Sequence, residues 1–389
     1  MKILKTKKNV IVLFGVMFIV LALVIILLHA IYMQDRAPKH GLYFIDNQGD
    51  IVSKDYCNVR VFKDGISKYF DEGDKETGYY INTDFKTLGN KKYDSDHVLV
   101  SVYNGEPIFT VMESGSIEIL DKDMNMISSI PYNTAEEKWL NQIVSKIGTN
   151  GLFSIRDSQS GKWGYMDING NMVIEPKYNR AEAFNDDNVA VVYDSAKDAY
   201  GIIDSEGNYK IEPSFHSMEL CGNGMAFVAE NEKDAYQFIN LEGERLTDKK
   251  YSDNIGYTDC DSQFFDGYIA VLDRKEKVFG FLDENLNYLV EPKYDEVCNF
   301  SHGMAVVKNK DGLYGYIDTT GTEVIPCQYE SVTFFGDYDL AAVKVNGKWG
   351  MIKKDGSYYI EPTLSYIEPF SCGYSLISLD KGQKVKICK

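Results

Sequence analysis

One pattern recurs along most of this chain with a period of about 36 residues, and this repetition constrains the fold more than any other feature. Its best-preserved copy is Lys162–Tyr178, KWGYMDINGNMVIEPKY. Apolar and polar residues alternate on both sides of the turn sequence at 167–170, and Pro176 removes a backbone donor near the end. The stretch predicts a β-hairpin, and its repetition predicts a stacked array in which each unit packs on the next.

The copies align on the glycine that follows the tryptophan, which we call the register position. Along the chain it holds Gly41, Gly78, Gly115, Gly164, Gly201, Gln237, Gly280, Gly315 and Gly350. An aromatic residue precedes it in the better copies. We expect these pairs to be structural, with the ring packed between repeats and the glycine allowing close backbone approach. The residues concerned are Trp163, Gly164, Tyr200, Gly201, Phe279, Gly280, Tyr314, Gly315, Trp349 and Gly350.

Each unit continues with a proline, then a ring, and ends in an apolar run such as residues 189–191, which predicts a third strand. The sequence therefore predicts an all-β array of about nine three-stranded repeats, solenoid-like or propeller-like. The intervals between register positions are unequal, from 35 to 49 residues. Because closure into a ring demands near-identical rotations, we expect an open, twisted array.

An apolar run without charged side chains, residues 10–31, precedes the repeats. As a helix it spans roughly 30 Å, the thickness of a bilayer core. No small-residue cleavage site follows it, which favours an uncleaved transmembrane signal anchor. The basic residues 1–9 then form a cytoplasmic tail, and residues 32–39 form a linker. We expect a single-pass cell-membrane protein whose repeats lie outside the cytoplasm.

The repeats divide into two parts. Residues 40–160 hold degenerate β repeats, and residues 161–389 hold the better copies. In the first part, the sequence at 134–137 is a capping box followed by apolar residues at helical spacing, which predicts one inserted helix over about 134–147. Residues 384–387 are predicted to complete the last unit as an edge strand, with lysines that discourage further pairing.

Charge and motifs exclude several kinds of chemistry. The formal net charge of −17 repels phosphate backbones, so no nucleic-acid partner is expected. No phosphate-binding glycine motif is present, so no nucleotide or other cofactor is expected. The five histidines are isolated from one another, and no catalytic or metal-binding residue is expected. Acidic turns such as Asp167–Gly170 suggest calcium, but tight turns need the same residues and the loops are too short.

The seven cysteines show no CxxC pair, and we expect mostly inert thiols. A disulfide between Cys260 and Cys298, which lie in connectors of adjacent units, is the alternative. Three tyrosines follow the prolines at strand ends, where a hydroxyl can reach water. We expect these residues, Tyr178, Tyr294 and Tyr329, to be partly exposed ligand contacts.

The pattern resembles the WG-repeat family of bacterial proteins, also called KWG repeats. The resemblance covers about residues 162–379. It rests on Lys162-Trp163-Gly164, Glu175-Pro176-Lys177-Tyr178, Glu291-Pro292-Lys293-Tyr294 and Lys348-Trp349-Gly350. The earlier units lack the tryptophan and most prolines. The resemblance implies an all-β repeat domain in a bacterial envelope or secreted protein, and it brings no established catalytic residues.

Repeat arrays present broad surfaces rather than deep pockets. The sequence therefore favours a non-enzymatic, membrane-tethered binding or scaffolding protein whose partner is a cell-wall glycan or a surface protein. The alternative is a cell-envelope enzyme with its site in the irregular connector at 253–265. A sensing role is disfavoured, because the nine residues predicted on the cytoplasmic side of the membrane are too few to form an output domain.

Overall fold

The computed structural model describes residues 41–54, 56, 58–72, 74, 76–94, 97–113, 115–132, 143–232, 235–251, 263–273, 275–379 and 384–388. Within these ranges, no helix has the length and apolar character needed to cross a bilayer. The predicted anchor at 10–31, with the tail and linker on either side of it, lies outside the described residues.

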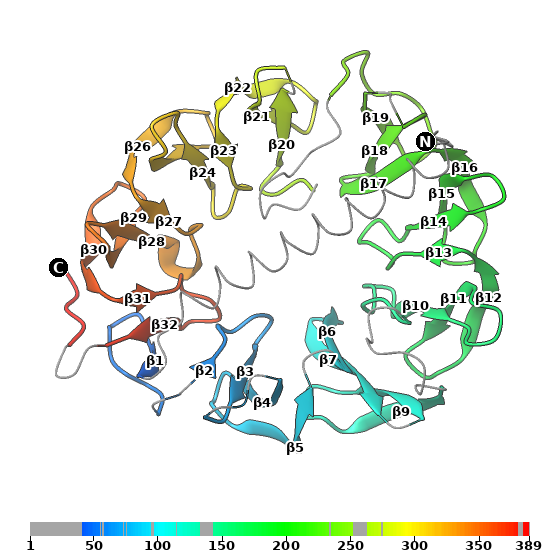
Figure 1. Cartoon of the computed structure of the whole chain (residues 1–389), viewed down its shortest axis with the longest axis horizontal. Coiled ribbons are helices and arrows are strands. Elements are labelled where there is room, and N and C mark those ends of the chain that lie inside the picture. Colours follow the sequence, from blue (N-terminus) through cyan, green and yellow to red (C-terminus); the bar gives the residue numbers. More distant parts are fainter. Residues whose placement is uncertain are drawn as a thin grey trace, which may run out of the picture.

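Nine antiparallel sheets follow one another around a closed ring, which is a β-propeller (Figure 1). Five sheets have four strands and four have three, counted over the described residues. The prediction of all-β repeats is confirmed. The predicted three strands per unit are too few, because the innermost strands of several blades are only two residues long and escape a periodicity search.

The blades, numbered 1 to 9 around the ring, contain the following strands, each set running from inside to outside. Blade 1 has β31 (Tyr366–Ile367), β32 (Ser375–Ser378) and β1 (Leu42–Ile45); blade 2 has β2 (Asn58–Val59), β3 (Ile66–Phe70), β4 (Thr77–Asn82) and β5 (Thr87–Asp94); blade 3 has β6 (Val98–Tyr103), β7 (Glu106–Glu113), β8 (Ser116–Leu120) and β9 (Met126–Pro131). Blade 4 has β10 (Leu152–Arg156), β11 (Trp163–Asp167) and β12 (Met172–Tyr178); blade 5 has β13 (Arg180–Ala181), β14 (Ala190–Asp194), β15 (Ala199–Ile203) and β16 (Tyr209–Phe215); blade 6 has β17 (Ser217–Gly222), β18 (Met225–Ala229) and β19 (Gln237–Asn240). Blade 7 has β20 (Tyr268–Asp273), β21 (Val278–Asp283) and β22 (Tyr288–Tyr294); blade 8 has β23 (Glu296–Val297), β24 (Met304–Lys308), β25 (Tyr314–Asp318) and β26 (Glu323–Tyr329); blade 9 has β27 (Ser331–Val332), β28 (Leu340–Val345), β29 (Lys348–Lys353) and β30 (Tyr358–Leu364), with a short 3-10 turn, η4 (Asp337–Asp339), before β28.

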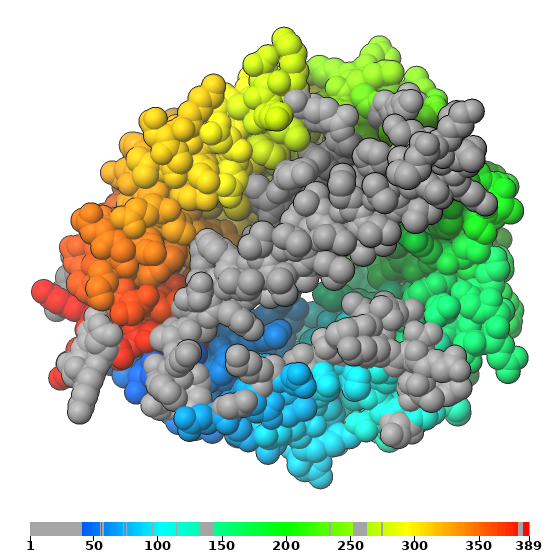
Figure 2. Space-filling view, viewed as in Figure 1, coloured from blue at the N-terminus to red at the C-terminus, as the bar shows by residue number. Residues whose placement is uncertain are grey.

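The ring is closed by the two ends of the described chain. Strand β1 pairs with β32 in antiparallel register, with Leu42 opposite Ser378. In Figure 2 the blue first strands meet the red C-terminal strands at this junction. The expected open array is therefore wrong. Unequal repeat spacing does not prevent closure, because the described strands before and after the two long intervals, β9 and β10 and then β19 and β20, still occupy successive blades of the ring.

Closure follows from how the repeats map onto the blades. A sequence repeat begins on the third strand of one four-stranded blade and ends on the second strand of the next, as β25 and β28 show. In such a blade the second strand pairs with the third, which the following repeat supplies. The last repeat ends in β32, which has no following repeat, and β1 supplies the missing partner.

The register glycines face a bulge in the outer strand. Between Trp163 and Tyr165 the register of β11 against β12 shifts, which leaves Gly164 opposite residues 175–177. A Cβ on Gly164 would lie 2.4 Å from the carbonyl oxygen of Ile174 and 2.8 Å from the nitrogen of Pro176. The same collision occurs at Gly201, Gly280, Gly315 and Gly350. The register glycine thus recurs opposite a proline-containing bulge, where a side chain would collide with the backbone of the outer strand.

Rings two residues after the register aromatics fill the seams between blades. Tyr165 of blade 4 packs against Phe184 of blade 5 with ring centroids 4.8 Å apart, and its hydroxyl donates to the Glu182 carbonyl at 2.9 Å. Tyr316 repeats this arrangement with Phe335 in blades 8 and 9. Residues two apart in a strand point to the same face, so these rings lie on the face that the register aromatics occupy, as the shared cluster of Trp163 and Tyr165 shows.

Two further expectations change. Residues 143–147, the end of the predicted helix, are not helical, and Val144 instead forms an antiparallel bridge with Ile155. Ile143 and Val144 are buried in a core cluster, which suits β-branched residues on the inner edge of blade 4. Residues 133–142 lie outside the described residues. At the C-terminus, the predicted edge strand is reduced to one bridge, between Ile387 and Ile360 of β30.

Candidate functional site

The register aromatics divide into buried and half-buried rings. Phe279 and Trp349 are buried in core clusters, which confirms the packing role predicted for them. Trp163, Tyr200 and Tyr314 are half-buried and only border their clusters. These three rings therefore keep surface that a ligand can contact.

The tyrosines after the prolines are buried instead of partly exposed. Tyr178, Tyr294 and Tyr329 are 2%, 4% and 3% exposed. The Tyr178 hydroxyl donates to the carbonyl of Gly207, in a turn of the next blade, at 3.3 Å. Burial raises the pKa of all three hydroxyls. The expected exposure is wrong because each strand end is covered by the following blade, so these rings are not surface contacts.

A cleft of about 380 Å³ lies between blades 4 and 5. Blade 4 contributes Arg156 from β10 and Trp163 from β11, which are cross-strand partners. The connection to the next blade contributes Asn179. Blade 5 contributes Arg180, Ala181, Glu182, Val191, Tyr193 and Tyr200. Three rings, two guanidinium groups and an amide therefore line one cavity at the lower end of the usual ligand-pocket range.

Local contacts hold the polar and aromatic walls in place. The Asn179 side-chain oxygen accepts hydrogen bonds from Lys162 Nζ and from the Ser195 backbone, both at 3.0 Å. The rings of Tyr193 and Tyr200 lie 4.8 Å apart, and the Tyr193 hydroxyl donates to Asp198 at 2.6 Å. This hydrogen bond is the main cause that raises the pKa of Tyr193. The cleft is thus preformed.

Blade 8 carries a different pair of residues at the positions of Arg180 and Tyr193. Arg180 pairs with Tyr193 across β13 and β14, and the matching pair in blade 8 is Glu296 with Lys308. Those two form an ion pair at 2.9 Å, which is the main cause that raises the pKa of Lys308. The guanidinium carbon of Arg180 lies 5.9 Å from the Tyr193 centroid, and among the described residues it forms no ion pair. Blade 5 therefore has an exposed cation where blade 8 has an ion pair.

Glu182 is the carboxylate among the cleft residues. Its side chain still reaches solvent, yet surrounding protein desolvates the carboxyl and raises its pKa to about 6. Repulsion from Glu219, on the inner strand of blade 6, acts in the same direction. The carboxyl is therefore poised to change charge slightly below neutral pH.

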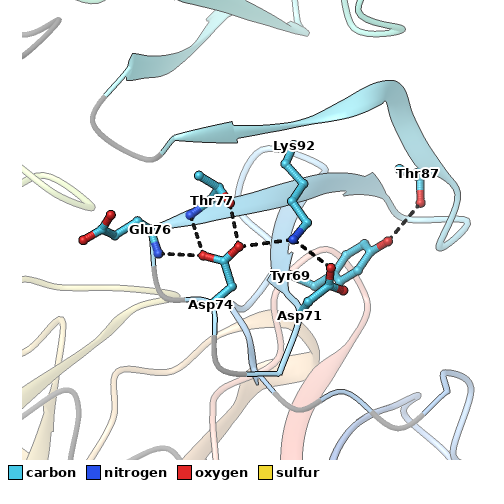
Figure 3. A network of polar contacts seen from close by, with 7 residues as sticks. All are labelled: Tyr69, Asp71, Asp74, Glu76, Thr77, Thr87 and Lys92. Carbon is cyan, nitrogen blue, oxygen red and sulfur yellow. Dashed lines mark hydrogen bonds and ion pairs between the residues drawn. The ribbon is translucent and has the colours of Figure 1, made fainter.

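A second polar cluster lies on blade 2, where the β3–β4 loop meets β5 (Figure 3). Lys92 Nζ lies 2.8 Å from Asp71 and 3.1 Å from Asp74. Hydrogen bonds, first from the Thr77 side chain, hold the pKa of Asp74 well below its usual range, and the two carboxylates raise the pKa of Lys92. Groups with charges fixed in this way stabilise a loop and are poorly suited to proton transfer near pH 7.

The acidic turns use their carboxylates internally, as predicted. Asp167 Oδ1 accepts hydrogen bonds from the backbone of Asn169 at 3.0 Å and of Asn171 at 2.8 Å, and Asp204, Asp283 and Asp318 repeat this. In the part of the chain that the structure describes, no three or more His, Cys, Asp or Glu residues gather as metal ligands.

The cysteine predictions are only partly testable. Cys221 is a free thiol in the core, and burial raises its pKa. Cys327 is also free, and burial raises its pKa to about 11. Both are therefore unreactive as thiolates at neutral pH. Cys260 lies outside the described residues, so its pairing with Cys298 stays a prediction.

Sequence reasoning missed Arg156, Asn179, Arg180 and Tyr193 as a group. The repeats were aligned on the register aromatics, and the residues of the innermost strand were not compared between repeats. The position of Arg180 holds a different residue in blades 2, 8 and 9, namely Asn58, Glu296 and Ser331, so a comparison of the repeats gives only a weak signal.

The closed ring, with register glycines packed against bulged outer strands, defines this chain as a nine-bladed β-propeller. Five segments match the sequence profile of the family described as WG containing repeat, at residues 163–195, 200–233, 279–314, 314–349 and 349–382. No curated protein matches the sequence at a significant level.

Solved structures share the fold at low identity. The chain resembles a eukaryotic initiation factor with a TM-score of 0.52 and 10% identity, over 76% of this chain and 87% of the other. BamB from Moraxella catarrhalis aligns with a TM-score of 0.41 and 11% identity, over 74% and 96% of the two chains. A streptogramin B lyase aligns with a TM-score of 0.35 and 13% identity, over 72% and 96%. Among these three, only the likeness to the initiation factor is strong enough to support the fold, and none bears on function.

Proposed function

We propose that this chain is a non-enzymatic, membrane-tethered binding protein that holds its propeller outside the cytoplasm and binds a cell-wall glycan in the cleft between blades 4 and 5. The apolar, uncharged run at 10–31, long enough for a membrane anchor, supports the proposed location. The observation that carries the proposal is the cleft itself, in which half-buried rings from two blades border one preformed cavity.

The cleft residues suit a sugar. Trp163, Tyr193 and Tyr200 offer aromatic faces on which the apolar side of a sugar ring can stack, and Asn179 and the arginines offer donors for its hydroxyls. Aromatic surface beside a few fixed polar groups is the usual composition of a small-ligand site. A protein partner would need a broader surface than this cavity provides.

Binding is favoured over hydrolysis because cleavage of a glycosidic bond uses two carboxyl groups on either side of the bond. Glu182 has the raised pKa of a general acid, but it is the one carboxylate among the cleft residues. The alternative enzyme site at 253–265 falls mostly outside the described residues and stays a prediction.

The test is retention of the full-length protein, solubilised in mild detergent, on purified insoluble cell wall. Trp163→Ala should reduce retention at least severalfold because it removes the largest ring of the cleft. Tyr338→Ala is the matched control, since it removes an exposed ring on a different blade. Melting temperatures check that both variants are folded. Equal retention of the two folded variants, or release of reducing sugar ends by the native protein, would overturn the proposal.

A further inference from the structure

Two arginines from different blades meet at the cleft without an equal number of carboxylates. Arg156 comes from blade 4 and Arg180 from blade 5, whereas Glu182 is the acidic residue of the lining. Arg180 is exposed and forms no ion pair with any carboxylate in the described part of the chain. A solvated surface arginine is the ordinary interpretation of one such residue, but it does not explain why two gather around aromatic rings in a cavity.

The position of Arg180 holds Asn58 in blade 2, Glu296 in blade 8 and Ser331 in blade 9, so the cation is a feature of blade 5 and not of the repeat. At the matching position the chain carries Glu296, which neutralises Lys308 at 2.9 Å. In blade 5 both residues of the pair differ, so the position is cationic and its cross-strand neighbour, Tyr193, is a ring. The substitution leaves a positive charge facing the cavity, with no partner from the same blade to neutralise it.

Asn179 adds a donor at the same place. Its side-chain oxygen already accepts from Lys162 and from the Ser195 backbone. Its amide nitrogen has no hydrogen-bond partner among the described residues, so two N–H donors remain for a ligand. The cleft thus combines aromatic faces with donors, and a guanidinium fork matches the two oxygens of a carboxylate or phosphate.

We infer that the cleft selects an anionic glycan, whose carboxylate or phosphate group is held by Arg180 and Asn179 while a neighbouring sugar ring packs on the aromatic residues. Arg156 supplies a second positive charge from the opposite wall. This inference rests on the proposed function and specifies the class of glycan bound.

The acidic body of the protein limits the form of the ligand. At physiological salt a charge is felt mainly within about one Debye length, ~8 Å, so a ligand confined to the cleft interacts chiefly with the cleft residues, whereas a long polyanion also meets the acidic surface of a protein with a net charge of −17. A short oligomer or a chain end that places one or two charges inside the cleft therefore binds better than a dense polyanion lying across the surface.

The test uses the full-length protein in detergent micelles and calorimetric titration with three short oligomers. Oligogalacturonate carries carboxylates, oligo(glycerol phosphate) carries phosphates, and a malto-oligosaccharide is neutral. We expect at least one charged oligomer to bind more tightly than the neutral one. Whichever charged oligomer binds more tightly identifies the group recognised.

Two variants separate charge from folding. Arg180→Ala should weaken binding of the charged oligomer by about tenfold or more, the effect expected for a lost charged hydrogen bond. The double variant Arg180→Glu with Tyr193→Lys installs the pair that blade 8 already contains, so the fold should accept it, and it should abolish the preference for the charged oligomer. Lys210→Ala, which removes a surface cation from β16 outside the cleft, should change nothing.

The outcomes distinguish this inference from the proposed function. If Arg180→Ala binds charged and neutral oligomers as the native protein does, the inference is overturned while glycan binding stands. If the native protein prefers the neutral oligomer, the inference is likewise overturned. If none of the three oligomers binds and the cell wall does not retain the protein, both proposals fail.

Discussion

Replacing the register glycine Gly350 by alanine tests why the Trp-Gly pair recurs. The φ angle of Gly350 lies outside the left-handed region, so alanine can adopt the backbone conformation. The new Cβ would lie 2.4 Å from the carbonyl oxygen of Ile360 and 2.7 Å from the nitrogen of Pro362. These are backbone atoms of β30, which cannot rotate away as a side chain can. We expect a cost near the upper end for overpacking, about 3 kcal/mol.

Gly312 provides the matched control. It has a φ of +79°, and a Cβ there meets nothing within 4 Å. Gly312→Ala should cost about 1–2 kcal/mol through backbone strain alone, and Gly312→Asn should cost less because asparagine tolerates this region. At Gly350, asparagine should be at least as damaging as alanine, since the obstacle is space and not φ.

The assay is thermal unfolding followed by circular dichroism. For a chain of this size, 1 kcal/mol corresponds to roughly 2 °C, so Gly350→Ala should lower the melting temperature by about 6 °C. A shift within 1 °C of native for Gly350→Ala would refute the close-approach argument. So would an asparagine variant at Gly312 that destabilises as much as the one at Gly350.

Three further perturbations follow from the same structure. Phe44→Ala removes a ring of β1 that lies opposite Leu376 of β32 at the closure and shares a core cluster with it, and it should destabilise by about 3–5 kcal/mol, measured by chemical denaturation; an unchanged unfolding midpoint would show that closure contributes little stability. The pKa of Asp74 is lowered in the folded protein, so the ionised Asp74 stabilises the fold above its unfolded pKa of about 3.9, and this stabilisation is lost as the pH falls below that value. Asp74→Asn should therefore flatten the decline of the melting temperature below about pH 4. Parallel curves of melting temperature against pH for the two proteins would contradict this. Because the pKa of Glu182 is raised to about 6, lowering the pH from 7 to 5 removes a negative charge from the cleft. Oligogalacturonate, which stays ionised in this range, should therefore bind more tightly at pH 5. Glu182→Gln should abolish this pH dependence, and a dependence that persists in the variant would point to another group.

Local features of the fold could be read from the sequence because they depend on neighbouring residues. The period, the hairpin at Lys162–Tyr178 and the acidic turns all arise from contacts within one repeat. The glycine at 164 was correctly assigned to close approach, since its spacing from Pro176 is the same in several copies. The buried role of Phe279 and Trp349 also follows from the repeat, because a small β unit must bury its rings against a neighbour.

The candidate site was out of reach of the same reasoning. Arg156 and Arg180 belong to different repeats and look like ordinary polar residues in each one. They become one site only because blades 4 and 5 pack side by side. The tyrosines after the prolines were wrongly predicted to be exposed. The sequence places Tyr178 at a strand end, and only the neighbouring blade, with Gly207, covers the ring.

The sequence by itself determined the local structure of each repeat, because turns, bulges and strand alternation are set by residues a few positions apart. The tertiary structure decided that the array closes, since β1 pairs with β32 and joins residues at opposite ends of the described chain. No local pattern encodes that pairing. It depends on the small rotation between successive blades, which accumulates over all nine and is fixed by side-chain packing in every seam.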